Sequence, residues 1–61
     1  MITEDLQLEI ARLKSQLTAE ENRYFDAIKN NQIVEELKKI RRKIEELKYD
    51  LEQKIEMLSL L

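Results

Sequence analysis

Apolar residues recur along the chain at alternating intervals of four and three. In the first half these positions are Leu6, Ile10, Leu13, Leu17, Tyr24 and Ala27. In the second half they are Ile33, Leu37, Ile40, Ile44, Leu47, Leu51 and Leu58. Heptad spacing of this kind predicts amphipathic helices that each bury one face against another helix. The pattern therefore predicts two long helices, over about residues 4–28 and 33–58.

The two apolar stripes are out of phase with each other. Continued at the same spacing, the first stripe would reach Asn31, Val34 and Lys38, whereas the second stripe uses positions one residue earlier. One residue turns the stripe by roughly 100° around a helix, so a single straight helix could not present both stripes to one partner. The phase changes within residues 28–33, and we therefore predict a turn at about 29–32.

Local chemistry around the phase change also favours a turn. Asn tolerates the left-handed backbone conformation that ends helices, and it also caps new ones. Lys29 suits the negative end of the first helix, and Glu35 and Glu36 suit the positive end of the second. At the N-terminus, Thr3 can cap the first helix after a short frayed start at residues 1–2.

Folding the chain back about residue 32 places complementary side chains opposite each other. Apolar residues then face apolar residues, in the pairs Leu6–Leu58, Leu13–Leu51, Leu17–Leu47, Tyr24–Ile40 and Ala27–Leu37. Charges also pair: Glu9 with Lys54, Arg12 with Asp50 and Glu52, Glu20 and Glu21 with Lys43 and Arg42, and Asp26 with Lys38. The prediction is an all-α antiparallel two-helix hairpin, a helical coiled-coil hairpin that forms one domain over residues 1–61. The alternative is a single long helix in a parallel coiled-coil dimer.

A hairpin of this length has little core of its own, so we expect it to associate. Ile28, Val34, Ile55 and Met57 widen the apolar stripe towards that of a bundle, and twofold pairing is the usual closed symmetry. We predict a homodimeric four-helix bundle; a helical protein partner is the alternative, because Arg41 and Lys48 interrupt the stripe. The expected association seam comprises Leu6, Ile10, Leu13, Leu17, Tyr24, Ile28, Ile33, Leu37, Ile40, Ile44, Leu47, Leu51, Ile55 and Leu58.

Glu20 occupies a seam position where the heptad pattern requires an apolar residue. We expect its methylene groups to cover Ile44 while its carboxylate reaches towards Lys43 or Arg42. The favoured interpretation is a tolerated flaw in the seam, and the alternative is a device that sets the register of the two helices.

The composition argues against most chemistry. The chain has no His and no Cys, so the usual general base, the thiolate nucleophile and any disulfide are missing. Glu pairs at positions 20–21, 35–36 and 45–46 lack the His that di-metal bundle sites use. We therefore expect no enzyme activity, no catalytic residue, no cofactor and no metal. The sequence has neither a signal peptide nor a membrane-spanning run, which favours a cytoplasmic location without membrane contact.

A basic cluster in the second helix is the strongest candidate for another function. Its candidate phosphate contacts are Lys38, Lys39, Arg41, Arg42 and Lys43. Such a cluster can bind a nucleic-acid backbone. However, Glu35, Glu36, Glu45 and Glu46 bracket it, and the net charge of −2 gives no overall attraction to nucleic acid. We expect a solvated charged face on a non-enzymatic protein-interaction module, with a small nucleic-acid-binding regulator as the alternative function. No motif of a known family is evident.

Overall fold

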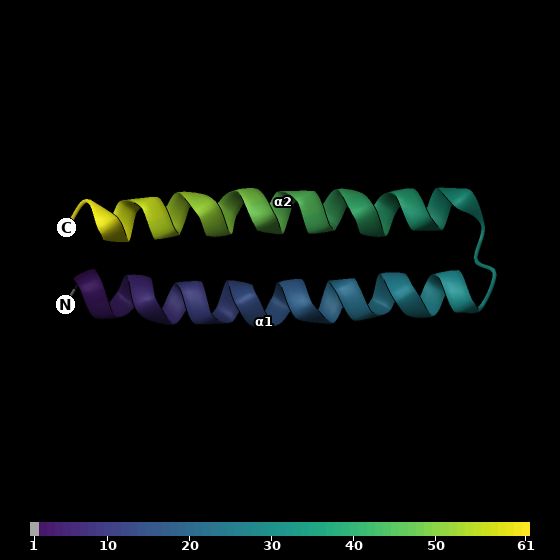
Figure 1. Cartoon of the computed structure of the whole chain (residues 1–61), viewed down its shortest axis with the longest axis horizontal. Coiled ribbons are helices and arrows are strands. Elements are labelled where there is room, and N and C mark those ends of the chain that lie inside the picture. Colours follow the sequence, from purple (N-terminus) through teal and green to yellow (C-terminus); the bar gives the residue numbers. More distant parts are fainter. Residues whose placement is uncertain (1) are drawn as a thin grey trace.

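The chain folds back on itself as two antiparallel helices. The computed structural model describes residues 2–61, with α1 spanning Ile2–Lys29 and α2 spanning Val34–Ser59. The two helices lie side by side, with both termini at one end and the turn at the other (Figure 1). The backbone extends over 45 × 14 × 11 Å, so the hairpin is a thin rod. The predicted all-α hairpin is confirmed, and the single straight helix is excluded.

The turn begins with a left-handed residue at the end of α1. Asn31 has φ 55°, a conformation that Asn tolerates better than most residues. The Gln32 N–H donates to the Ala27 carbonyl at 3.0 Å, and the Asn31 N–H donates to the Ile28 carbonyl at 3.2 Å. This pair of bonds is the Schellman pattern, which satisfies carbonyls that the helix end would leave unpaired. Asn31 therefore ends α1 and does not cap α2.

The second helix starts without a hydrogen bond from a capping side chain at Ile33. That residue precedes α2 in an extended conformation, with φ −66° and ψ 153°, and its carbonyl accepts hydrogen bonds from the backbone N–H groups of Glu36 and Leu37. The apolar repeat predicts that Ile33 begins the second helix and lies in the seam. It lies instead just outside the helix with its side chain exposed, because the chain is still reversing direction at that residue.

The start of α1 also differs from the expectation. The helix begins at Ile2, so Thr3 lies within its first turn rather than at the cap, and Ile2 is helical rather than frayed. The remaining part of the predicted frayed start falls on Met1, which lies outside the described residues. Glu4 and Asp5 occupy the first turn, where their negative charges interact favourably with the positive end of the helix.

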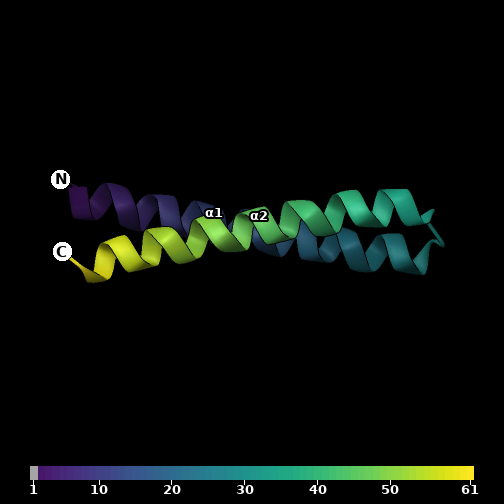
Figure 2. The same ribbon diagram turned by 90° about the horizontal axis from the view of Figure 1, so that it is seen from above.

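The core is a single stripe along the contact between the helices. Its buried residues are Leu6, Ile10, Leu13 and Ala27 of α1 and Ile40, Ile44 and Leu47 of α2. In the turn half, Leu17, Tyr24 and Leu37 pack around this stripe and remain half-buried. The helices cross near their middles when the hairpin is viewed from above (Figure 2). Because no third element covers the contact, none of the side chains of residues 2–61 is completely buried.

Candidate association surface

Two edges flank the apolar stripe, one on each side. Residues seven apart return almost to the same side of a helix, so each edge follows a seven-residue repeat. The "Arg41 edge" comprises Lys14, Glu21 and Ile28 of α1 with Val34, Arg41, Lys48 and Ile55 of α2, together with Phe25, which lies outside the repeat but one helical turn after Glu21 beside the same groove. The "Glu36 edge" comprises Glu9, Gln16, Arg23 and Asn30 of α1 with Glu36, Lys43, Asp50 and Met57 of α2.

The turn half of the Arg41 edge is apolar and open. Phe25, Ile28 and Val34 are 65%, 47% and 63% exposed. The ring of Phe25 meets that of Tyr24 edge to face, with centroids 6.3 Å apart and planes at 68°, which is a favoured aromatic geometry. Beside these residues runs a groove between the helices, lined by Glu21, Tyr24, Phe25, Arg41, Ile44, Glu45 and Lys48. The surface thus combines exposed apolar side chains with charged groups around a partly buried floor.

The turn half of the Glu36 edge is polar instead. Its groove is lined by Arg23, Asp26, Ala27, Asn30, Gln32, Glu36 and Ile40, and it continues past Glu20, Lys39 and Lys43. The apolar residues in these linings, Ala27 and Ile40, are buried in the stripe itself. Within the described part of the chain, this edge therefore presents no exposed apolar side chain near the turn.

The ion pairs are distributed unequally between the two edges. On the Glu36 edge, Glu20 pairs with Arg23 at 3.8 Å, Glu36 with Lys39 at 3.5 Å, and Glu9 with both Arg12 and Lys54 at 3.9 Å. Among residues 2–61, no ion pair involves the charged side chains of the Arg41 edge and its groove, namely Lys14, Glu21, Arg41, Glu45 and Lys48. On the Glu36 edge, Lys43 and Asp50 likewise make no ion pair within the described residues, so the two edges differ in how many of their charges are paired.

One predicted ion pair between the helices is confirmed. Among residues 2–61, Arg12, Glu20 and Lys38 pair within their own helix instead, and the predicted pairing of Glu21 with Lys43 or Arg42 does not form. Glu9 reaches Lys54 across the contact as expected. Arg12 pairs with Glu9 instead of Asp50 or Glu52. Residues three apart on one helix have Cβ atoms about 5–6 Å apart, so their side chains can pair whatever the tertiary structure is.

Glu20 and Lys38 show the same preference for a neighbour on their own helix. Glu20 pairs with Arg23 rather than with Lys43 or Arg42, although Glu20 and Lys43 line one groove. Lys38 pairs with Glu35 at 3.9 Å rather than with Asp26. The side chain of Glu20 is 21% exposed, and it lines a groove together with Ile40.

The expected seam residues fall into three groups in the single hairpin. Those at the centre of the stripe are buried: Leu6, Ile10, Leu13, Ile40, Ile44 and Leu47. Those at its margins are half-buried: Leu17, Tyr24, Leu37, Leu51 and Leu58. The remaining three are exposed: Ile28, Ile33 and Ile55. The expected seam does not include Phe25, and only the position of Phe25 beside Ile28 and Val34 on one edge reveals it as part of an apolar surface.

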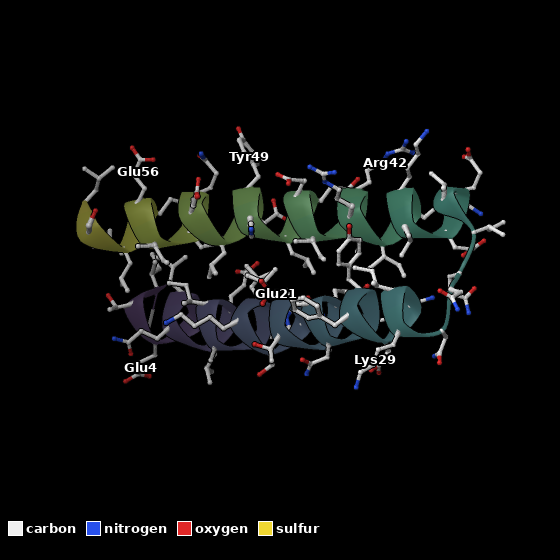
Figure 3. The ribbon with its side chains drawn as sticks, turned by 45° about the vertical axis from the view of Figure 1, so that its right-hand side comes forward. Glu4, Glu21, Lys29, Arg42, Tyr49 and Glu56 are labelled. Carbon is white, nitrogen blue, oxygen red and sulfur yellow. The ribbon has the colours of Figure 1, made fainter. Side chains whose placement is uncertain are left out.

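The five basic residues of the candidate phosphate site do not share one surface. Arg41 lies on the Arg41 edge, Lys43 on the Glu36 edge, and Arg42 on the outer face of α2, where Figure 3 shows it pointing away from α1. Lys38 and Lys39 are paired with Glu35 and Glu36. The cluster that is continuous in sequence is thus divided around the helix and partly neutralised.

Two other kinds of site can be assessed within residues 2–61. No three carboxylates converge there to form a group that could hold a metal ion, and neither helix has the length and apolarity that a membrane span requires. Comparison of the chain with protein-family models, curated proteins and solved structures finds no match.

Proposed function

We propose that the chain is a non-enzymatic protein-interaction module that self-associates, with two hairpins forming a homodimeric four-helix bundle. The observation that carries the proposal is the apolar turn half of the Arg41 edge, whose charges make no ion pair within residues 2–61. Exposed apolar side chains that gather on one side, with charged groups around them, are typical of a protein–protein contact.

The accessible surface of the hairpin supports the proposal. The chain has a mass of 7.4 kDa. The scaling of surface with mass gives an expected exposure of about 4200 Å² for a monomer of that size. This hairpin exposes 5061 Å², which exceeds the expected value by roughly 850 Å². Each partner of a standard protein–protein interface buries about 800 Å². An interface of standard size with a second copy would therefore bury about as much surface as the hairpin exposes beyond the value expected for its mass.

The small size of the core also supports self-association. Among residues 2–61, only seven apolar side chains are buried, and each of them still keeps 5–8% of its surface exposed. Domains of about 60 residues are marginally stable even when they have a full core, and association is one of the usual remedies. A bundle would enclose the stripe from a second side and add apolar burial at its margins.

Nucleic-acid binding is less well supported than association. Phosphate contacts need several cations on one surface, and here the five basic residues are spread around α2 with two of them already paired. A different helical protein could also occupy the Arg41 edge, but a second copy accounts for the surface without any further component.

Sedimentation equilibrium from micromolar to millimolar concentration tests the proposal. We expect a particle of twice the 7.4 kDa chain mass to dominate at the upper end, with helical circular dichroism throughout. A folded, helical monomer that persists across the whole range would refute self-association. Titration of the same samples with mixed RNA and DNA at low and high salt tests the alternative, since salt-sensitive binding there would favour a nucleic-acid regulator.

A further inference from the structure

We infer that the second copy docks on the Arg41 edge with both turns at the same end of the assembly. In this "turn-to-turn" arrangement the twofold axis runs parallel to the long axis of the hairpin. Each α1 then lies against α2 of the partner subunit. The inference rests on the proposed self-association and specifies the surface and orientation that it uses.

Apolar complementarity selects the edge and the end. Phe25, Ile28 and Val34 are all exposed in the turn half of the Arg41 edge, and among the described residues the Glu36 edge has no equivalent there. Turn-to-turn docking sets Ile28 of one hairpin beside Val34 of the partner subunit at both related positions. The two apolar groups then cover each other, which removes apolar surface of both copies from water.

The same arrangement also brings two opposite charges together. Glu21 and Arg41 line one groove, so they lie at the same level along the hairpin, yet they make no ion pair with each other. When α1 faces α2 of the partner subunit at equal level, Glu21 faces Arg41 of the partner subunit. The twofold axis repeats this pair, so two groups of opposite charge that are unpaired in each chain meet in the dimer.

The opposite orientation mismatches the apolar surfaces. If the turns lay at opposite ends, each helix would face the same helix of the partner subunit in reverse. Arg41 would then approach Lys48 of the partner subunit, and Glu21 would approach Lys14 of the partner subunit, so this orientation also has one repulsive and one attractive pair. The apolar turn end would face the terminal end of the hairpin, where the polar residues Gln7 and Ser59 lie near Ile55. The apolar contact therefore decides between the two orientations.

Turn-to-turn docking also predicts where the contact is looser. Lys14 would face Lys48 of the partner subunit in the terminal half, and the two cations would repel each other. We therefore expect the closest packing at the turn end, with the contact opening towards the termini. This gradient distinguishes the arrangement from a bundle that is packed uniformly along its length.

Distances between spin labels test the orientation directly. Lys29 lies near the turn and Glu56 near the C-terminus, and both side chains point away from the other helix (Figure 3). One label per chain, on K29C or on E56C, reports the distance between equivalent sites in the dimer. Turn-to-turn docking predicts that both distances are well below the 45 Å length of the hairpin, with a broader and longer distribution for E56C.

Reversed docking would give the opposite result in the same experiment. Both like-labelled dimers would then show distances close to the 45 Å hairpin length, while a mixture of K29C and E56C chains would show a short distance. That outcome would overturn the inferred orientation and leave self-association intact. Absence of any dimer in sedimentation would instead refute both.

Charge exchange between chains tests the Glu21–Arg41 contact. The single variants E21R and R41E each place like charges together at both symmetric positions, and we expect each to self-associate about 5- to 30-fold more weakly. Mixing E21R with R41E restores two attractive pairs, so heterodimers should form with about the original affinity. Neighbours within each chain do not change on mixing, so rescue can come only from contacts between subunits. Two variants that associate as the original chain does, or that fail to rescue each other, would overturn this contact.

Discussion

The two edges of the hairpin share one core but have different surfaces. On the Glu36 edge, acidic and basic groups pair with each other, in a chain that links Arg12, Glu9 and Lys54 and in two local pairs near the turn. On the Arg41 edge, within residues 2–61, the charges have no such partners, and Phe25, Ile28 and Val34 expose apolar surface between them. One edge thus has most of the ion pairs of the described chain, and the turn half of the other has exposed apolar side chains beside unpaired charges.

In the proposed dimer, this difference would separate the residues that fold the hairpin from those that associate. The stripe holds the two helices together, and on the Glu36 edge the ion pair of Glu9 with Lys54 crosses between them. The Arg41 edge contributes little to the isolated hairpin, because its large apolar residues remain about half exposed or more. Substitutions on the two edges should therefore change different measured quantities, and the following predictions depend on that separation.

Ile28→Ala should have the largest effect, and it should act on association. Ile28 and Met57 are almost equally exposed, at 47% and 49%, but lie on opposite edges, so Met57→Ala is a matched control. In the proposed dimer, Ile28→Ala removes apolar burial in both copies, about 2 kcal/mol in total, or roughly 30-fold in the dissociation constant. Sedimentation equilibrium should show this weakening for Ile28→Ala only. Equal weakening by both variants would show that the edges do not differ in association.

Glu20→Leu should raise stability without changing association. Glu20 occupies a position in the stripe on the side of the Glu36 edge, and its side chain is only 21% exposed. Leu there should add about 1–2 kcal/mol to the free energy of unfolding, because Glu already covers part of the surface. The melting temperature should rise by several degrees in thermal denaturation followed by circular dichroism.

The control for Glu20→Leu is Glu46→Leu, which makes the same exchange at an exposed position of α2. It should change the melting temperature little, because the new side chain stays in water. A clear loss of stability in Glu20→Leu would contradict the prediction and would show that the carboxylate sets register or makes a required pair.

The smallest effect is expected for the ion pair that crosses between the helices. A double-mutant cycle of Glu9→Ala and Lys54→Ala should give a coupling energy of about 0.2–1 kcal/mol in dilute protein, as for exposed pairs elsewhere. The equivalent cycle of Glu21→Ala and Arg41→Ala should give almost none under those conditions, because these two groups are unpaired in the hairpin. Substantial coupling of Glu21 with Arg41 in the monomer would contradict the distinction between the edges.

Much of the fold can be predicted from the sequence because it depends on the period of single helices. The apolar repeat identifies the face that each helix buries, and the phase change near Asn31 shows that the two faces cannot lie on one straight helix. Asn31 itself takes the left-handed conformation that its side chain permits. These properties depend on residues close together in the chain, so they need no knowledge of the tertiary contact.

The ends of the helices and most ion pairs could not be predicted in the same way. Ile33 continues the apolar repeat, but the reversal of the chain leaves it outside α2. Glu20 has a complementary partner on each helix, and the choice of Arg23 depends on which cation its short side chain reaches. Sequence pattern identifies the candidates, whereas side-chain geometry decides between them.

The surface proposed for association is the property that only the tertiary structure decided. The sequence by itself determined that Phe25 and Ile28 lie near each other on α1 and that Val34 and Arg41 share a side of α2. It did not determine that these two sides form the same edge, because that depends on how each helix is rotated about its axis when the stripes meet. Packing of Ala27 and Tyr24 against Ile40 and Ile44 sets that rotation. It thereby brings Phe25, Ile28 and Val34 to one edge and places the ion pairs of Glu9 and Glu36 on the other.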